Sequence, residues 1–126
     1  MILDVAARRA ELTPGRDALW WDGRWYTYLE LNERATRTAA LLAGMGVTKG
    51  DRVMIAAHNH VAHFDLVLAT AKLGFAYTPL NVRLSTAELH GIGEYLRPSV
   101  VLHDAEHAAL AAAAGEGATL LDLTTF

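Results

Sequence analysis

Apolar and polar residues along this chain follow two periods, one typical of helices and one typical of strands. The clearest short pattern lies around Asp22 and Gly23, where aromatic residues stand on both sides, namely Trp20, Trp21, Trp25 and Tyr26. Asp-Gly suits a two-residue type I′ turn, in which both central residues adopt positive φ. The pattern therefore predicts a β-hairpin over residues 20–26.

Helical patterns stand on both sides of this hairpin. Residues 1–12 (MILDVAARRAEL) predict an amphipathic helix rather than a signal sequence. After the hairpin, Thr27-x-x-Glu30 matches a capping box, in which each residue satisfies a backbone N–H of the other. The apolar stripe that follows is Leu31, Ala35, Thr38, Leu42 and Met45, at spacings of four and three. Gly44 and Gly46 supply the helix stop.

The rest of the chain alternates apolar strands with helices. We expect strands at residues 52–57, 75–80, 99–103 and 118–123. We expect helices at 60–73 with Asn59 as the N-cap, behind a second capping box at Ser85 and Glu88, and at 104–114 with Asp104 at the start. This order predicts an α/β fold with a mostly parallel sheet, helices on both faces and an N-terminal β-hairpin. With no repeat or linker, residues 1–126 are expected to form a single α/β unit.

Composition narrows the class of protein. The net charge of −3 gives no basic surface for nucleic acid, and the absence of cysteine excludes disulfides and thiolate chemistry. No apolar run approaches the roughly 18 residues that cross a bilayer. The expectation is a cytoplasmic protein with no membrane span and no nucleic-acid partner.

Phosphate-binding and nucleophile motifs are absent from the sequence. Neither GxGxxG nor GxxxxGK[ST] occurs, and the close glycine pairs, Gly44 with Gly46 and Gly91 with Gly93, fall at a helix end and inside a helix. The serines lack a G-x-S-x-G elbow. The aromatic residues 20–28 are explained more simply by a hairpin packed on a core than by a ligand-stacking patch. We therefore expect no ATP site and no catalytic residue within this chain.

Six histidines raise the question of a metal. His60 and His63 would project together from a helix start, whereas His58 ends a strand; a solvated helix start is the simpler interpretation. His103-x-x-Glu106-His107 matches a metalloprotease pattern that requires both histidines on one helix. Here His103 completes a strand and Asp104 suits an N-cap, so the context is missing. We expect no metal site.

Two blocks, TYLEL at residues 27–31 and AKLGFAYTPLNVRLSTAEL at residues 71–89, resemble the opening motifs of adenylate-forming (AMP-binding) enzymes. The resemblance covers about residues 18–104 in consistent order. The segment from Pro79 to Leu84, followed by Glu88 and Leu89, looks most like acyl-CoA synthetases, including long-chain-fatty-acid–CoA ligases. The helix entry HNHVAH departs from the proline-asparagine entry familiar in that family.

The resemblance implies an acid–thiol ligase. Such enzymes use Mg-ATP to convert a carboxylic acid, here a fatty acid, into an acyl-adenylate and then transfer the acyl group to CoA. Their phosphate loop, tyrosine-threonine-glutamate segment, adenosine-binding aspartate and C-terminal lysine have no counterpart in residues 1–126. The resemblance therefore implies an N-terminal scaffold fragment, inactive alone and binding no cofactor tightly, whose partner is the remainder of the ligase polypeptide.

One residue is a candidate for ligand contact. In some family members the arginine that matches Arg83 contacts a phosphate of CoA, and a guanidinium suits phosphate because it offers a planar fork of donors. The simpler interpretation is a surface arginine beside a helix N-terminus, with Asn81 as a turn residue.

Two further function classes stay open from the sequence. A free-standing small α/β protein that keeps this scaffold would act by binding or assembly, and its exposed strand edges would favour self-association. A small metal-dependent hydrolase using the histidines is the more remote class.

Overall fold

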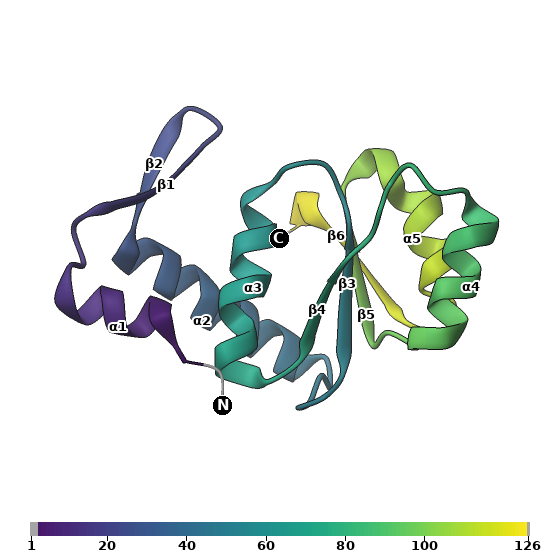
Figure 1. Ribbon diagram of the computed structural model, residues 1–126, viewed down its shortest axis with the longest axis horizontal. Coiled ribbons are helices and arrows are strands. Elements are labelled where there is room, and N and C mark those ends of the chain that lie inside the picture. Colours follow the sequence, from purple (N-terminus) through teal and green to yellow (C-terminus); the bar gives the residue numbers. More distant parts are fainter. Residues whose placement is uncertain (1–2, 126) are drawn as a thin grey trace. The chain divides into compact units, whose positions relative to one another are not determined.

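The computed structural model describes residues 3–125, and they form two compact units. Unit 1 comprises the residues up to Thr48 together with His60–Gly74. Unit 2 comprises Lys49–Asn59 and the residues from Phe75 onward. The hairpin and the three N-terminal helices belong to unit 1, and the sheet with two further helices belongs to unit 2 (Figure 1).

Unit 1 contains a two-stranded antiparallel hairpin and three helices. Its elements are α1 (Val5–Leu12), β1 (Asp17–Trp21), β2 (Arg24–Thr27), α2 (Tyr28–Gly44) and α3 (Val61–Leu73). The hairpin turn has φ values of 50° at Asp22 and 82° at Gly23, as a type I′ turn requires. The hairpin prediction is confirmed. The first two residues of the predicted N-terminal helix lie outside the described residues.

The hairpin places one aromatic face inward and one outward. Tyr26 is buried with Leu31 and Val61, and Trp21 packs against this cluster. Trp20 and Trp25 are about half exposed and meet edge to face, with ring centroids 5.7 Å apart. The inner aromatic residues therefore serve the core of unit 1, as predicted, whereas Trp20 and Trp25 cover each other on the outer face.

Helix α2 begins and packs as its sequence indicates. The Thr27 hydroxyl accepts a hydrogen bond from the Glu30 N–H at 3.2 Å, and the Glu30 carboxylate accepts one from the Thr27 N–H at 3.3 Å. The residues of its predicted stripe that are buried are Leu31, Ala35, Thr38 and Leu42. The capping box and this helix face are confirmed, whereas Met45, the last residue of the predicted stripe, is the half-buried C-cap beyond the end of the helix.

The cap of α3 differs from the sequence expectation. The N-cap is His60, whose Nδ1 accepts a hydrogen bond from the Ala62 N–H at 3.0 Å, and not Asn59. An unprotonated imidazole nitrogen can replace an asparagine oxygen as the acceptor. The His60 ring also lies 4.6 Å from the Trp21 ring. The helix therefore begins one residue later than predicted, and the ring that caps it also contacts the hairpin.

Helices α2 and α3 are joined by an ion pair with a fully buried carboxylate. Arg34 donates from Nε and Nη2 to the two carboxylate oxygens of Asp65, at 3.0 and 2.8 Å. Asp65 is 1% exposed. Burial raises its pKa, and the hydrogen bonds from Arg34 oppose that rise. Lys72 Nζ also donates hydrogen bonds to Asp4 Oδ2 at 3.0 Å and to Asn32 Oδ1 at 2.6 Å.

Unit 2 is built on a four-stranded parallel sheet in the order β4-β3-β5-β6. The strands are β3 (Arg52–Ala56), β4 (Ala76–Pro79), β5 (Val100–His103) and β6 (Thr119–Asp122). The helices are α4 (Thr86–Leu96) and α5 (Ala108–Ala114), with short 3₁₀ turns at Ala105–His107 and Leu123–Thr125. Pro79 lies on an outer strand, where its missing N–H costs no ladder bond inside the sheet.

The two helices of unit 2 cover the sheet with small and branched side chains. The buried residues of this core are Met54, Ala56, Leu89, Val101, Ala111 and Ala114. Helices α4 and α5 approach closely at Gly93, where an added Cβ would lie 1.9 Å from the Ala114 carbonyl oxygen. Gly93 is therefore required by packing, a reason that the sequence pattern did not supply.

These elements confirm the predicted α/β class, with a parallel sheet, helices and an N-terminal hairpin. No helix among residues 3–125 has the length and apolar character needed to cross a membrane. The assignment of residues 1–126 to one N-terminal subdomain stays a prediction.

Candidate functional site

The carboxyl ends of the four parallel strands lie at one edge of the sheet, where open α/β sheets bind their ligands. The chain leaves β3 towards His58, β4 towards Arg83 and β5 towards Asp104. The polar residues with candidate chemistry in unit 2 are thus concentrated in the loops that follow these strands.

The loop after β4 presents Arg83 to solvent. The Asn81 side-chain oxygen accepts a hydrogen bond from the Arg83 N–H at 3.0 Å, and the Asn81 carbonyl accepts one from the Leu84 N–H at 3.1 Å. Asn81 therefore acts as a turn residue. Ser85 is the N-cap of α4, and its hydroxyl accepts a hydrogen bond from the Glu88 N–H. Within residues 3–125 the guanidinium of Arg83 has no ion-pair partner. Its role towards CoA stays a prediction.

Asp104 connects the loop after β3 with the loop after β5. Its Oδ2 accepts a hydrogen bond from the backbone N–H of His58 at 3.0 Å. Its Oδ1 accepts one from the backbone N–H of His107 at 3.0 Å and lies 2.6 Å from the Nδ1 of the same residue. The predicted N-cap role of Asp104 is confirmed, and the same carboxylate holds two histidines from distant parts of the sequence in place.

These contacts determine the charge of Asp104. Burial raises the pKa of its carboxyl, but the hydrogen bonds from the His58 N–H and from His107 outweigh burial and hold the pKa below the ordinary value. A carboxylate that stays ionised requires a donor at the His107 Nδ1, so the proton of a neutral His107 ring lies on Nδ1.

His58, Glu106 and His107 converge beside Asp104. One nitrogen or oxygen of each lies within 4.8 Å of those of the other two. The His58 Nε2 contacts Glu106 Oε2, and the His107 Nε2 lies 3.5 Å from that same oxygen. The two imidazole rings meet edge to face with centroids 4.6 Å apart. His58 and Glu106 are exposed, whereas His107 is 8% exposed.

The sequence interpretation missed this convergence. It paired His60 with His63, yet His60 caps α3 and stacks on Trp21. It also set the His103-x-x-Glu106-His107 pattern aside, and His103 does end β5, with its Nδ1 2.8 Å from the Asp104 carbonyl oxygen. The useful signal was the position of His58 and Asp104 after two apolar strands, because neighbouring parallel strands bring such residues together.

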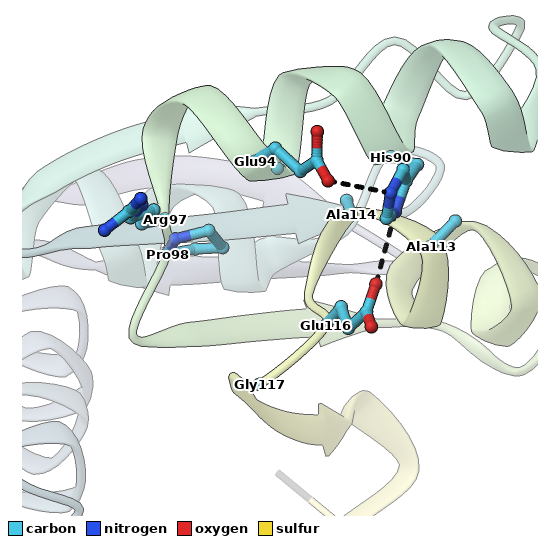
Figure 2. A pocket seen from close by; sticks show the side chains of 9 residues that line it. His90, Glu94, Arg97, Pro98, Ala113, Ala114, Glu116 and Gly117 are labelled. Atoms are coloured by element: carbon cyan, nitrogen blue, oxygen red, sulfur yellow. Dashed lines mark ion pairs between the residues drawn. The ribbon is translucent and has the colours of Figure 1, made fainter.

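A second polar cluster lies between α4 and the turn after α5, in a cavity of about 590 Å³ (Figure 2). There His90 stands between two carboxylates: its Nε2 lies 3.2 Å from Glu94, and its Nδ1 lies 3.4 Å from Glu116. The carboxylates approach opposite sides of the ring, so they cannot share one ligand with a single His90 nitrogen. We interpret the cluster as polar contacts between surface side chains.

Comparison with known proteins identifies the family. The AMP-binding enzyme family model matches residues 6–125. A feruloyl-CoA synthase of Amycolatopsis sp is 38% identical over 114 residues, which are 90% of this chain and 23% of that protein. The long-chain-fatty-acid–CoA ligase FadD13 of Mycobacterium tuberculosis is 37% identical over 82 residues, which are 65% of this chain and 16% of that protein.

Solved structures of CoA ligases are also similar to this chain. A long-chain-fatty-acid CoA ligase from Rhodopseudomonas palustris superposes with a TM-score of 0.87 and 31% identity, over 95% of this chain and 32% of that one. The o-succinylbenzoate CoA synthetase of Bacillus subtilis in complex with ATP and magnesium superposes with a TM-score of 0.82 and 28% identity, over 95% and 32%. The chain spans only 23% and 16% of the length of the feruloyl-CoA synthase and of FadD13, respectively. With its ordered motifs, its fold and nearly its whole length matched, this chain belongs to the AMP-binding enzyme family.

Proposed function

We propose that this chain is the N-terminal scaffold of an AMP-forming acid–thiol ligase, which activates a carboxylic acid with ATP and transfers the acyl group to CoA. The observation that carries the proposal is the family match over residues 6–125 together with relatives that are CoA ligases. The chain alone is inactive, because the ATP-binding and acid-binding motifs of such ligases lie outside it. The intact enzyme works in the cytoplasm.

Mg-ATP and CoA are the proposed cofactors of the intact enzyme. None of the close glycine pairs of this chain offers a phosphate loop: Gly44 ends α2 and Gly46 follows its C-cap, and Gly91 and Gly93 lie inside α4. The chain is therefore expected to contribute the frame on which the ATP site is completed by the rest of the polypeptide. That remainder is its principal partner.

The first experiment measures the mass of the natural protein with an antibody raised against this chain. A species several times larger than 13.7 kDa is expected. That species and the 126-residue chain are then compared for AMP and acyl-CoA formation with acid, Mg-ATP and CoA. Activity confined to the longer species supports the proposal. A natural protein of 13.7 kDa, or AMP formation by the chain alone, would overturn it.

Within this function, Arg83 is proposed to contact a phosphate of CoA. Its exposed position, its lack of an ion-pair partner among the described residues and its place at the carboxyl edge support the role. In the active enzyme, Arg83→Ala should raise the KM for CoA about 10-fold, the loss of one charge-assisted hydrogen bond. The rate of acyl-adenylate formation, measured as exchange of pyrophosphate into ATP, should not change.

The matched control is Arg52, an exposed arginine at the amino end of β3, on the opposite edge of the sheet. Arg52→Ala should leave the KM for CoA unchanged. Equal effects of the two substitutions, or an effect of Arg83→Ala on pyrophosphate exchange, would contradict the CoA contact.

A fatty acid is the proposed substrate, supported by the likeness to the ligases of Mycobacterium tuberculosis and Rhodopseudomonas palustris. An aromatic acid is the second candidate, because the feruloyl-CoA synthase of Amycolatopsis sp is 38% identical over a longer span. A long-chain fatty acid and ferulate should be compared by kcat/KM on the intact enzyme. A higher value for ferulate would replace the first candidate with the second.

The outer strands β4 and β6 lead to the alternative of a small binding or assembly protein. Outer strands present unpaired backbone groups, which favour pairing with another chain. We expect the isolated chain to self-associate through them, and the intact ligase to cover them. Sedimentation of both species distinguishes the cases: a chain that stays monomeric at high concentration would remove the argument for assembly.

A further inference from the structure

The convergence of His58, Glu106 and His107 is not explained by cap or core formation alone. Asp104 already caps the turn at Ala105–His107 and needs neither Glu106 nor the His58 ring for that task. The His58 side chain is 66% exposed and that of Glu106 is 67% exposed, so nothing buries them against each other. Three groups that all bind metal ions nevertheless meet at the carboxyl edge of the sheet.

The ring of His107 is oriented as a metal-bound histidine is. Its Nδ1 lies 2.6 Å from the Asp104 carboxylate, which can only accept, so the imidazole donates there and Nε2 is the ring nitrogen that remains to face an ion. Metal-binding histidines commonly use one nitrogen for the metal and give the other N–H to a carboxylate, which fixes the ring and strengthens the ligand. His107 is also buried, so its ring is held in place before any ion arrives.

Asp104 extends this support to the second histidine. Its Oδ2 accepts from the backbone N–H of His58, so the loop after β3 is fixed against the loop after β5. Glu106 Oε2 lies beside the Nε2 of each histidine. The two carboxylates bring two negative charges to a pair of imidazoles, a balance that suits a divalent cation.

We propose that His58 Nε2, His107 Nε2 and a Glu106 carboxylate oxygen bind one divalent transition-metal ion of the zinc class, with Asp104 orienting His107. Two imidazoles and one carboxylate are a donor set that Zn²⁺ accepts, at bond lengths of about 2.0–2.2 Å. Ligand atoms in such a site lie about 3.3 Å apart, as those bond lengths require. The observed separations within 4.8 Å are therefore closed by small rotations of the exposed His58 and Glu106 side chains.

The donor set distinguishes this ion from magnesium. Mg²⁺ prefers an octahedral shell of oxygens and keeps several waters, whereas imidazole nitrogens suit zinc, copper, nickel and cobalt. The proposal therefore concerns a second kind of metal, apart from the Mg-ATP of the proposed reaction, and it does not depend on that reaction. It also replaces the expectation from the sequence alone that the chain holds no metal site.

The test is a calorimetric titration of the purified 126-residue chain with ZnCl₂ at neutral pH, repeated with MgCl₂. We expect one Zn²⁺ per chain and no binding of Mg²⁺ at the same concentrations. His58→Gln and Glu106→Gln change exposed side chains and should weaken Zn²⁺ binding at least about 10-fold, since losing a ligand should cost no less than losing the group that supports one. Asp104→Asn should weaken it about 10- to 100-fold, the range found when the carboxylate behind a metal-binding histidine is lost.

His90→Gln is the matched control. His90 is also a histidine flanked by two carboxylates, but those carboxylates lie on different nitrogens of its ring (Figure 2). Its removal should leave Zn²⁺ affinity unchanged. Circular dichroism of each variant verifies that the fold persists, and His58→Gln and Glu106→Gln keep the test valid if Asp104→Asn unfolds.

Three results would overturn the proposal. The first is no Zn²⁺ binding by the wild-type chain. The second is unchanged affinity in both His58→Gln and Glu106→Gln. The third is an equal loss in His90→Gln, which would mean that histidines bind the ion without a defined site.

Discussion

The two units of this chain place their buried polar groups differently. In unit 1 a carboxylate, Asp65, is buried in the middle of a helix and held by Arg34. In unit 2 the buried polar side chains among the described residues are His103 and His107, and both stand at or just beyond the carboxyl end of β5. Unit 1 thus uses polar groups inside its helix packing, whereas unit 2 keeps its core apolar and its polar groups at one edge.

This difference indicates that the buried polar groups have a different role in each unit. A buried ion pair between two helices adds little net stability, but it makes the loss of either partner costly. It therefore favours one alignment of α2 and α3. The polar groups at the carboxyl edge of the unit 2 sheet instead connect loops, as Asp104 does for His58 and His107, and they place exposed side chains such as that of His58 where a ligand can reach them. The two units can be followed separately, because all three tryptophans, Trp20, Trp21 and Trp25, lie in unit 1.

The largest effect is expected from breaking the buried pair. Arg34→Met leaves the Asp65 carboxylate buried without a partner and should lower the free energy of unfolding by about 3–5 kcal/mol. Tryptophan fluorescence in a urea titration reports this loss for unit 1. The double variant Arg34→Met with Asp65→Leu should recover most of it, because an apolar pair carries no desolvated charge. A loss below about 1 kcal/mol in the single variant would show that water reaches Asp65.

A smaller effect is expected in unit 2, from the close approach of α4 and α5. Gly93→Ala would place a Cβ 1.9 Å from the Ala114 carbonyl oxygen, and the shift needed to relieve it should cost about 1–3 kcal/mol. Gly91 lies in the same helix with nothing within 4 Å of its added Cβ. Gly91→Ala should therefore stabilise the protein by about 0.5–1 kcal/mol. Urea unfolding followed by circular dichroism checks the opposite signs; two changes of the same sign would contradict this packing.

The smallest effect is expected at the start of α2. Thr27→Ala removes one partner of the capping box and should cost about 1 kcal/mol, measured by urea unfolding with tryptophan fluorescence. Glu30→Gln removes the charge of the other partner. It should lower the free energy of unfolding by less than Thr27→Ala does, and by an amount that depends on pH.

The pH dependence follows from the sign of the Glu30 shift. The hydrogen bond from the Thr27 N–H is the main cause that holds the pKa of the Glu30 carboxyl below its ordinary value of 4.5; burial opposes it, and Arg24 adds a further lowering. A lowered pKa means stabilisation that is complete above 4.5 and is lost as the pH falls through the folded-state pKa. Wild type should exceed Glu30→Gln in stability at pH 7, and the difference should vanish on acidification. A difference that persists in acid would point to geometry rather than charge.

Local signals in the sequence predicted most of the fold. The Asp22–Gly23 turn, the Thr27–Glu30 box and the stripe of α2 each depend on neighbours in sequence, so they could be identified from the residues alone. The N-cap of α3 was assigned one residue too early because histidine is not among the preferred cap residues, although its bond from the Ala62 N–H is local. The contact of His60 with Trp21 could not be identified, because it joins segments far apart in the chain. The requirement for Gly93 escaped for the same reason, since its neighbour is Ala114 in another helix.

The sequence by itself determined the element types, the α/β class and the family, because these rest on periodicity, caps and the order of motifs. The tertiary structure decided which polar residues meet. Arg34 reaches Asp65 across 31 positions, and His58 reaches Glu106 across 48. No local pattern encodes such pairs: they arise when helices pack at one angle and when neighbouring parallel strands end at the same edge of a sheet.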